Sequence, residues 1–197
     1  MPAKTFDGLI AVLTSAVAAV GVVFGLFNSF LAELVPPFDD SQQTVGFVSI
    51  GTVVFLLALT LLIRTRLTVA SARYIGLVSM ACFLTAVVVF FPFRNITRTY
   101  VYRYPPASVS NEKQVRHIRG DLHAQGVERV KNVTVAQAVY RLGGPDLVNS
   151  MGILWGEKSR LAIIAKMEKL YVALTMLLTS AIFISGIALW RRQRPSR

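Results

Sequence analysis

Cysteine is almost absent from this sequence of 197 residues, which contains only Cys82. Because a disulfide joins two cysteines, an intrachain bridge is excluded, and the lone thiol does not indicate a redox compartment. Metal and redox centres built on paired cysteines are excluded for the same reason.

Recognisable catalytic motifs are also lacking. The sequence has no Gly-x-Ser-x-Gly turn, no phosphate-binding glycine loop and no His-Glu-x-x-His motif. Its long apolar blocks have no ionisable residue at their centres, where a proton relay or an intramembrane active site would need one. We therefore expect a protein that is not an enzyme and that carries no cofactor.

Histidine occurs twice, and both residues lie in the stretch "VRHIRGDLHAQG" over 115–126. If residues 111–125 form a helix, His117 and Asp121 share a face, whereas His123 lies about 120° away from it. Two ligands do not complete a metal site, which usually needs three or four. Asp121 is expected to pair with Arg119 instead, so the stretch is interpreted as a solvated helix face that binds no metal.

Charged residues are scarce as well, at 16% of the chain, whereas 54% of it is hydrophobic and the mean hydropathy is +0.56. These values are too apolar for an ordinary soluble domain. The excess lies in four blocks, and each reaches the roughly 20 apolar residues that cross a bilayer core. They predict transmembrane helices at about 8–35, 44–63, 74–93 and 170–190.

The blocks divide the chain into three regions: a membrane region over 1–93, a small basic extramembrane domain over 94–168, and the fourth membrane helix with a basic tail over 169–197. The fold class that this predicts is an all-α membrane protein with four transmembrane helices. A small, mainly helical domain, with room for one short strand, is inserted between the third and the fourth.

Local signals predict the elements of the inserted domain. "NITRTYVYRY", over 95–104, is rich in threonine and tyrosine and is typical of a strand. Apolar residues at helical spacing predict a helix over 111–125 that ends at Gly126. Thr134 and Gln137 predict a capping box, Gly143 a helix stop and Pro145 the first residue of the next helix. From about residue 159 the chain is expected to continue unbroken into the fourth membrane helix.

Short basic segments predict the orientation. Lys4, the connector over 64–73 and the tail over 191–197 bring eight basic residues to one side, against none in the short loop over 36–43. By the positive-inside rule, we expect a multi-pass protein of the cell membrane with cytoplasmic termini and the 94–168 domain outside. In the long segment from Arg94 to Lys169, seven basic residues lie near the bilayer and nearly balance the count, so a cytoplasmic domain stays open as the alternative.

The net charge of +11 bears on the partners. In a membrane protein it favours contact with anionic head groups over a nucleic-acid site, although a cytoplasmic domain would favour an intracellular signal such as a nucleotide or nucleic acid. A regulatory protein or a small anionic ligand is the other partner considered. Its predicted contacts are Arg116, Arg119 and Arg129.

The first apolar block carries a stripe of small and polar residues at steps of three and four. It starts at Ala11 and continues through Thr14, Ala18, Gly21, Gly25, Asn28 and Ala32. Such a repeat keeps one seam facing a partner helix, and small residues let helices approach closely in lipid. The seam packs either against the protein's own helices or between copies, where Asn28 would be the polar constriction of a pore.

These features predict a self-associating membrane protein that acts as a channel- or pore-type effector regulated by its small domain. The layout resembles the compact membrane effectors of bacterial antiviral defence systems. The resemblance covers no diagnostic motif and assigns no role to any residue. The alternative is a membrane-anchored receptor or accessory subunit whose basic domain holds an anionic ligand or a protein partner.

Overall fold

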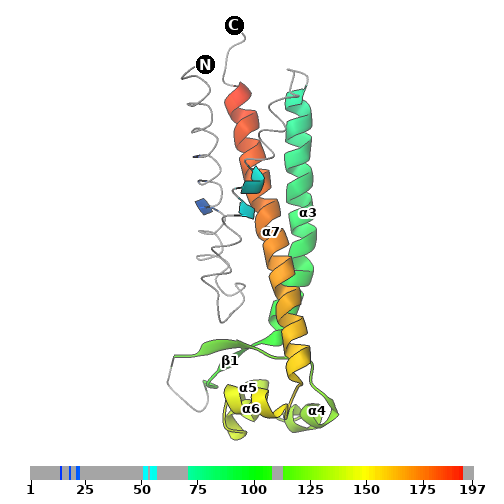
Figure 1. The fold of residues 1–197 in the computed structure, drawn as a ribbon, viewed down its shortest axis with the longest axis vertical. Coiled ribbons are helices and arrows are strands. Elements are labelled where there is room, and N and C mark those ends of the chain that lie inside the picture. Colours follow the sequence, from blue (N-terminus) through cyan, green and yellow to red (C-terminus); the bar gives the residue numbers. More distant parts are fainter. Residues whose placement is uncertain are drawn as a thin grey trace. The chain divides into compact units, whose positions relative to one another are not determined.

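The computed structural model describes residues 71–107 and 113–192, together with residues 14, 18, 21, 22, 51, 52 and 54–56. In these long stretches the elements, in chain order, are α3 (Ser71–Tyr100), β1 (Val101–Tyr104), β2 (Val115–Ile118), α4 (Ala124–Val130), α5 (Val135–Arg141), α6 (Pro145–Met151) and α7 (Glu157–Arg192). Figure 1 colours them along the sequence. The structure is mostly helical, as predicted, but it also contains a two-stranded hairpin.

The described residues divide into two compact units. The first, called the helical unit below, contains residues 71–91 of α3 and the part of α7 from Tyr171 onward. The second, called the hairpin domain, is Pro92–Leu170 and holds the hairpin, the three short helices and the adjoining ends of α3 and α7.

The strand predicted over 95–104 is confirmed for residues 101–104, which form β1, but it is wrong for residues 95–100, through which helix α3 continues. The hydroxyls of Thr97 and Thr99 each donate to the carbonyl four residues earlier, at 2.9 Å, so the helix satisfies them internally. Ile96 is buried among apolar side chains of the hairpin domain. Packing and satisfied hydroxyls thus override the strand preference of threonine and tyrosine.

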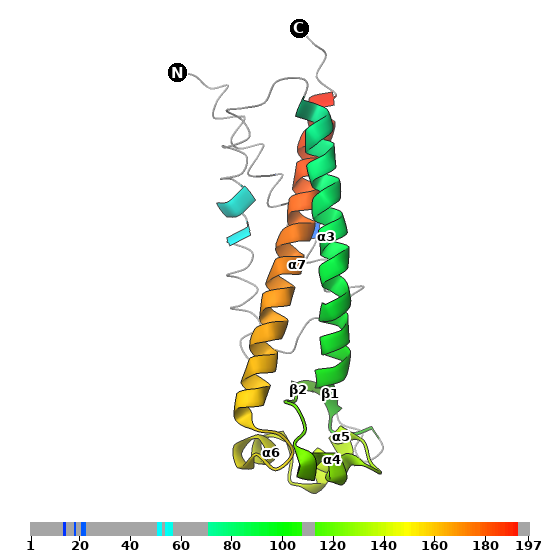
Figure 2. The same cartoon turned by 90° about the vertical axis from the view of Figure 1, so that its right-hand side faces the viewer.

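Helix α7 is continuous over 36 residues, Glu157–Arg192, which confirms the predicted unbroken run from about residue 159. In the helical unit, α3 and α7 lie side by side in both views (Figures 1 and 2). A direct hydrogen bond joins them, because Ser79 Oγ donates to the carbonyl of Ala181 at 2.9 Å.

Strands β1 and β2 pair antiparallel, with Val101 opposite Ile118 and Tyr104 opposite Val115. The predicted helix over 111–125 is therefore wrong. Its apolar spacing also fits a short strand, and pairing with β1 supplies the backbone partners that a helix would otherwise provide. Helix α4 begins only at Ala124, and Gly126, the predicted end, lies inside it.

The predicted capping signals of α5 and α6 are confirmed. Thr134 accepts from the Gln137 amide while the Gln137 side chain accepts from the Thr134 amide, which completes the capping box. Gly143 ends the helix with a φ of +97°, a backbone conformation that glycine adopts without the steric cost that a side chain would impose. Pro145 then opens α6, where its missing N–H costs nothing.

Two buried clusters hold the hairpin domain together. The larger joins the hairpin to the short helices and the turn before α7, through Tyr102, Ala138, Val139, Val148, Leu154 and Trp155. The second joins the end of α3, β2 and the start of α7, through Ile96, Ile118, Ile163 and Met167.

Candidate functional site

Helix α3 has the length and composition of a membrane span. Within the part of the chain that the structure describes, Gly76–Tyr100 is the one stretch that meets these criteria, with a mean hydropathy of 2.2 over its best window. At 1.5 Å per residue, its 25 residues extend for about 37 Å, which exceeds the roughly 30 Å of a bilayer's hydrocarbon core.

The apolar surface of this span is exposed. Only 17% of its most apolar window is buried, whereas the core helix of a soluble protein would bury most of it. The exposed side chains are large and apolar: Leu77, Met80, Phe83, Leu84, Val88 and Phe91. A continuous apolar surface of this kind indicates contact with lipid or with other helices.

The contact between α3 and α7 is polar at its centre. Ser79 Oγ lies 2.7 Å from Ser185 Oγ in addition to its bond with the Ala181 carbonyl. On α7, Thr175 and Thr179 are fully buried and donate to carbonyls of their own helix. The sequence gave no signal for Ser79, whose partners lie more than 100 residues away.

The predicted seam of the first block falls partly outside the described residues, because Gly25, Asn28 and Ala32 are not among them. Thr14, Ala18 and Gly21 are helical and exposed. A Cβ added to Gly21 would meet no atom within 4 Å. The exposure of these three residues in a single chain leaves the seam a prediction.

The three arginines predicted to contact an anion lie on different elements. Arg116 is on β2, Arg119 follows β2, and Arg129 is exposed in the last turn of α4. Arg119 is already engaged, since its Nε and Nη2 donate to the Thr99 carbonyl at 3.0 and 2.8 Å and its guanidinium stacks on the Tyr100 ring. A cation placed on the last carbonyls of α3 also complements the negative end of that helix.

The sequence predicted that Asp121 pairs with Arg119, but Asp121 makes other contacts. It also does not share a helix face with His117, because His117 lies on β2. Its Oδ1 accepts from the Tyr100 hydroxyl at 2.6 Å and its Oδ2 accepts from Ser159 Oγ at 3.2 Å. Its backbone amide donates to the same serine at 2.8 Å. Asp121 thus connects the last residue of α3 with the first turn of α7.

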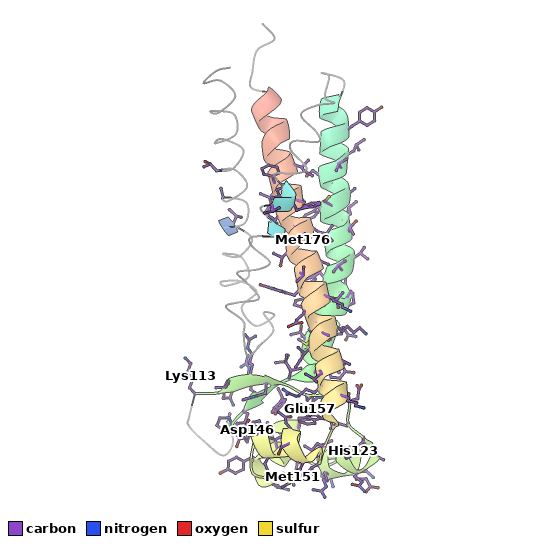
Figure 3. The ribbon with its side chains drawn as sticks, in the orientation of Figure 1. Lys113, His123, Asp146, Met151, Glu157 and Met176 are labelled. Carbon is purple, nitrogen blue, oxygen red and sulfur yellow. The ribbon has the colours of Figure 1, made fainter. Side chains whose placement is uncertain are left out.

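The two histidines have separate structural roles. The ring of His117 lies between those of Tyr102 and Tyr104, with centroids 5.8 and 6.1 Å away. His123, labelled in Figure 3, caps α4: its Nδ1 accepts from the Gly126 amide at 3.0 Å. Its Nε2 lies 2.9 Å from the Gly152 carbonyl and, in the neutral tautomer that leaves Nδ1 free to accept, donates to it. Among the described residues, no three histidine, cysteine, aspartate or glutamate side chains gather to hold a metal.

Among the described residues of the hairpin-domain core, Tyr102 is the one titratable group whose pKa is strongly shifted. Its hydroxyl is buried and has no hydrogen-bond partner there. Because burial disfavours the phenolate, the pKa of Tyr102 is raised. Its ring contacts those of His117 and Trp155 in the core of the hairpin domain.

Comparison of the chain with known protein families, curated proteins and solved structures found no match.

Proposed function

We propose that this chain is a non-enzymatic, multi-pass membrane protein that self-associates and acts as a channel- or pore-type effector under the control of its hairpin domain. The observation that carries the proposal is the exposed apolar surface of α3, which lies in the uncharged stretch over residues 74–93. Exposing such a surface to water would be costly, and a bilayer removes that cost.

Self-association is supported by two features. Thr14, Ala18 and Gly21 are exposed helical residues with small side chains. In the sequence, the same spacing of small or polar residues continues through Gly25, Asn28 and Ala32. The Ser79 bond to α7 shows that helices of this chain use small hydroxyl residues for close contact, as membrane helices commonly do. We propose that copies pack along the Thr14–Ala32 seam and that Asn28 lines the pore.

Control by the hairpin domain is supported by the way the domain holds the long helices. Arg119 donates two hydrogen bonds to the Thr99 carbonyl of α3, and Asp121 joins Tyr100 of α3 to Ser159 of α7. A ligand that displaced Asp121 would therefore act on both helices at once, whereas one that displaced Arg119 would act on the end of α3. A regulatory protein or a small anion recognised by Arg116 or Arg129 is the proposed trigger.

Conductance in planar bilayers tests the pore. We expect the purified protein to carry current and the variants Gly25→Leu and Asn28→Leu to reduce it at least about tenfold, because a bulky apolar group closes a narrow polar constriction. Val22→Leu, an exposed apolar position of the same helix, is the matched control and should conduct normally. Absence of current under every condition would reject the pore and favour the anchored receptor or accessory subunit.

Cysteine accessibility tests the topology. We propose cytoplasmic termini and an external hairpin domain, so in a Cys82→Ser background a cysteine at exposed Lys131 should react with an impermeant maleimide on intact cells. Lys113→Cys, also exposed, serves as an independent second position. Labelling only after lysis would reverse the orientation and favour an intracellular nucleotide or nucleic-acid signal.

A further inference from the structure

The apolar part of α3 ends abruptly in basic residues. Residues 74–93 contain no charge, and Arg94 and Arg98 follow one helical turn apart. Both side chains are exposed. Their position immediately after an uncharged, membrane-length stretch is where cationic side chains reach the head groups of a bilayer.

Helix α7 brings a second basic pair to the same level. Ile96 of α3 packs in one cluster with Ile163 and Met167 of α7, which sets the height of one helix against the other within the hairpin domain. Lys166 and Lys169 lie within one turn of Met167, and both are exposed. Arg94 and Arg98 lie within one turn of Ile96, so all four cations occupy one level around the helix pair.

Among the residues that the structure describes, none of these four cations makes a hydrogen bond or an ion pair. In residues 92–100 and 161–170 the sequence contains one acid, Glu168, whose side chain is half-buried. These two helix segments therefore carry a net positive charge.

We propose that Arg94, Arg98, Lys166 and Lys169 form a basic ring that binds the phosphate groups of anionic lipids in the adjoining leaflet. Guanidinium and ammonium groups both donate to phosphate oxygens, and anionic head groups attract basic residues near the membrane surface. The inference rests on the proposed membrane insertion. It adds a lipid-recognition site that anchors the ends of α3 and α7, next to the Arg119 and Asp121 contacts.

Electron paramagnetic resonance of spin-labelled lipids around the reconstituted full chain measures the association of anionic against zwitterionic lipid. The test variant replaces the four ring residues by glutamine: Arg94, Arg98, Lys166 and Lys169. The control removes the same number of charges from exposed sites outside the ring: Lys113, Lys131, Arg141 and Lys158.

We expect the native chain to prefer anionic lipid about fivefold or more, the ring variant less than about twofold, and the control to stay near the native value. An equal loss in the control, or no preference in the native chain, would overturn the ring. Inorganic phosphate that abolished the preference, where chloride of equal ionic strength did not, would reject lipid as the occupant. A complete absence of immobilised lipid would instead contradict membrane insertion, so the two proposals fail differently.

Discussion

Gly126 occupies a position where two effects of a methyl group oppose each other. It lies inside α4, so Gly126→Ala should gain up to about 1 kcal/mol from helix propensity. However, the new Cβ would lie 2.3 Å from the Leu154 carbonyl oxygen, which must move by roughly an ångström to restore normal contact.

The Leu154 backbone has little freedom to move. Its carbonyl accepts from the His123 amide at 3.2 Å, and both Leu154 and the next residue, Trp155, are fully buried. Losing that bond costs about 1 kcal/mol, and overpacking a buried site costs about 1–3 kcal/mol. The two losses outweigh the gain, so we expect Gly126→Ala to destabilise this region by about 1–3 kcal/mol.

Hydrogen exchange of the full chain measures this change without isolating the domain. Amides of α4 should exchange about 5- to 150-fold faster in Gly126→Ala, since exchange follows the free energy of local opening. Gly156→Ala is the control, because a Cβ there meets nothing within 4 Å, and it should change stability by only about 0.5 kcal/mol. Unchanged or slower exchange in Gly126→Ala would refute the close approach.

Three further substitutions test single contacts. Tyr102→Phe removes an unsatisfied hydroxyl and should stabilise the hairpin domain by about 1 kcal/mol. Burial raises the Tyr102 pKa above its ordinary value of 10.0, so the native domain should lose up to about 1.4 kcal/mol of unfolding free energy per pH unit above pH 10. The Phe variant should not show this loss. Urea unfolding at several pH values measures both, and parallel pH profiles would count against this reasoning. His123→Ala should cost about 1 kcal/mol by removing the cap of α4, whereas His123→Asn, which can still accept from the α4 amides, should cost less; equal losses would contradict the capping role. Ser79→Ala should weaken the α3–α7 pair by about 0.6 kcal/mol in thermal unfolding in detergent, and adding Ser185→Ala should lower it little further; full additivity would argue against a shared contact.

Predictions from the sequence succeeded where residues close together in the chain determine the local conformation. The capping box of Thr134 and Gln137, the stop at Gly143 and the start at Pro145 depend on neighbouring residues alone, and each is confirmed. The unbroken α7 follows from the absence of any breaking residue over its first turns.

Prediction failed where a distant partner decides the conformation. Residues 115–118 have spacing that suits a helix or a strand, and only pairing with β1, whose residues lie 11 to 17 positions earlier, selects the strand. The same holds for Asp121, whose partner Ser159 lies 38 residues away, and for Ser79, whose partners lie on α7. The seam and the predicted arginine contacts remain predictions, since they concern partners outside the single chain.

The burial of Trp155 provides an optical probe of the hairpin domain. Its indole is fully enclosed, and its Nε1 donates to Asn149 Oδ1 at 3.1 Å. The chain has only one other tryptophan, Trp190, so Trp190→Phe would leave a single fluorophore. Its emission should be blue-shifted and shielded from aqueous quenchers until the Tyr102–Trp155 core opens, which would let spectroscopy follow that core within the intact chain.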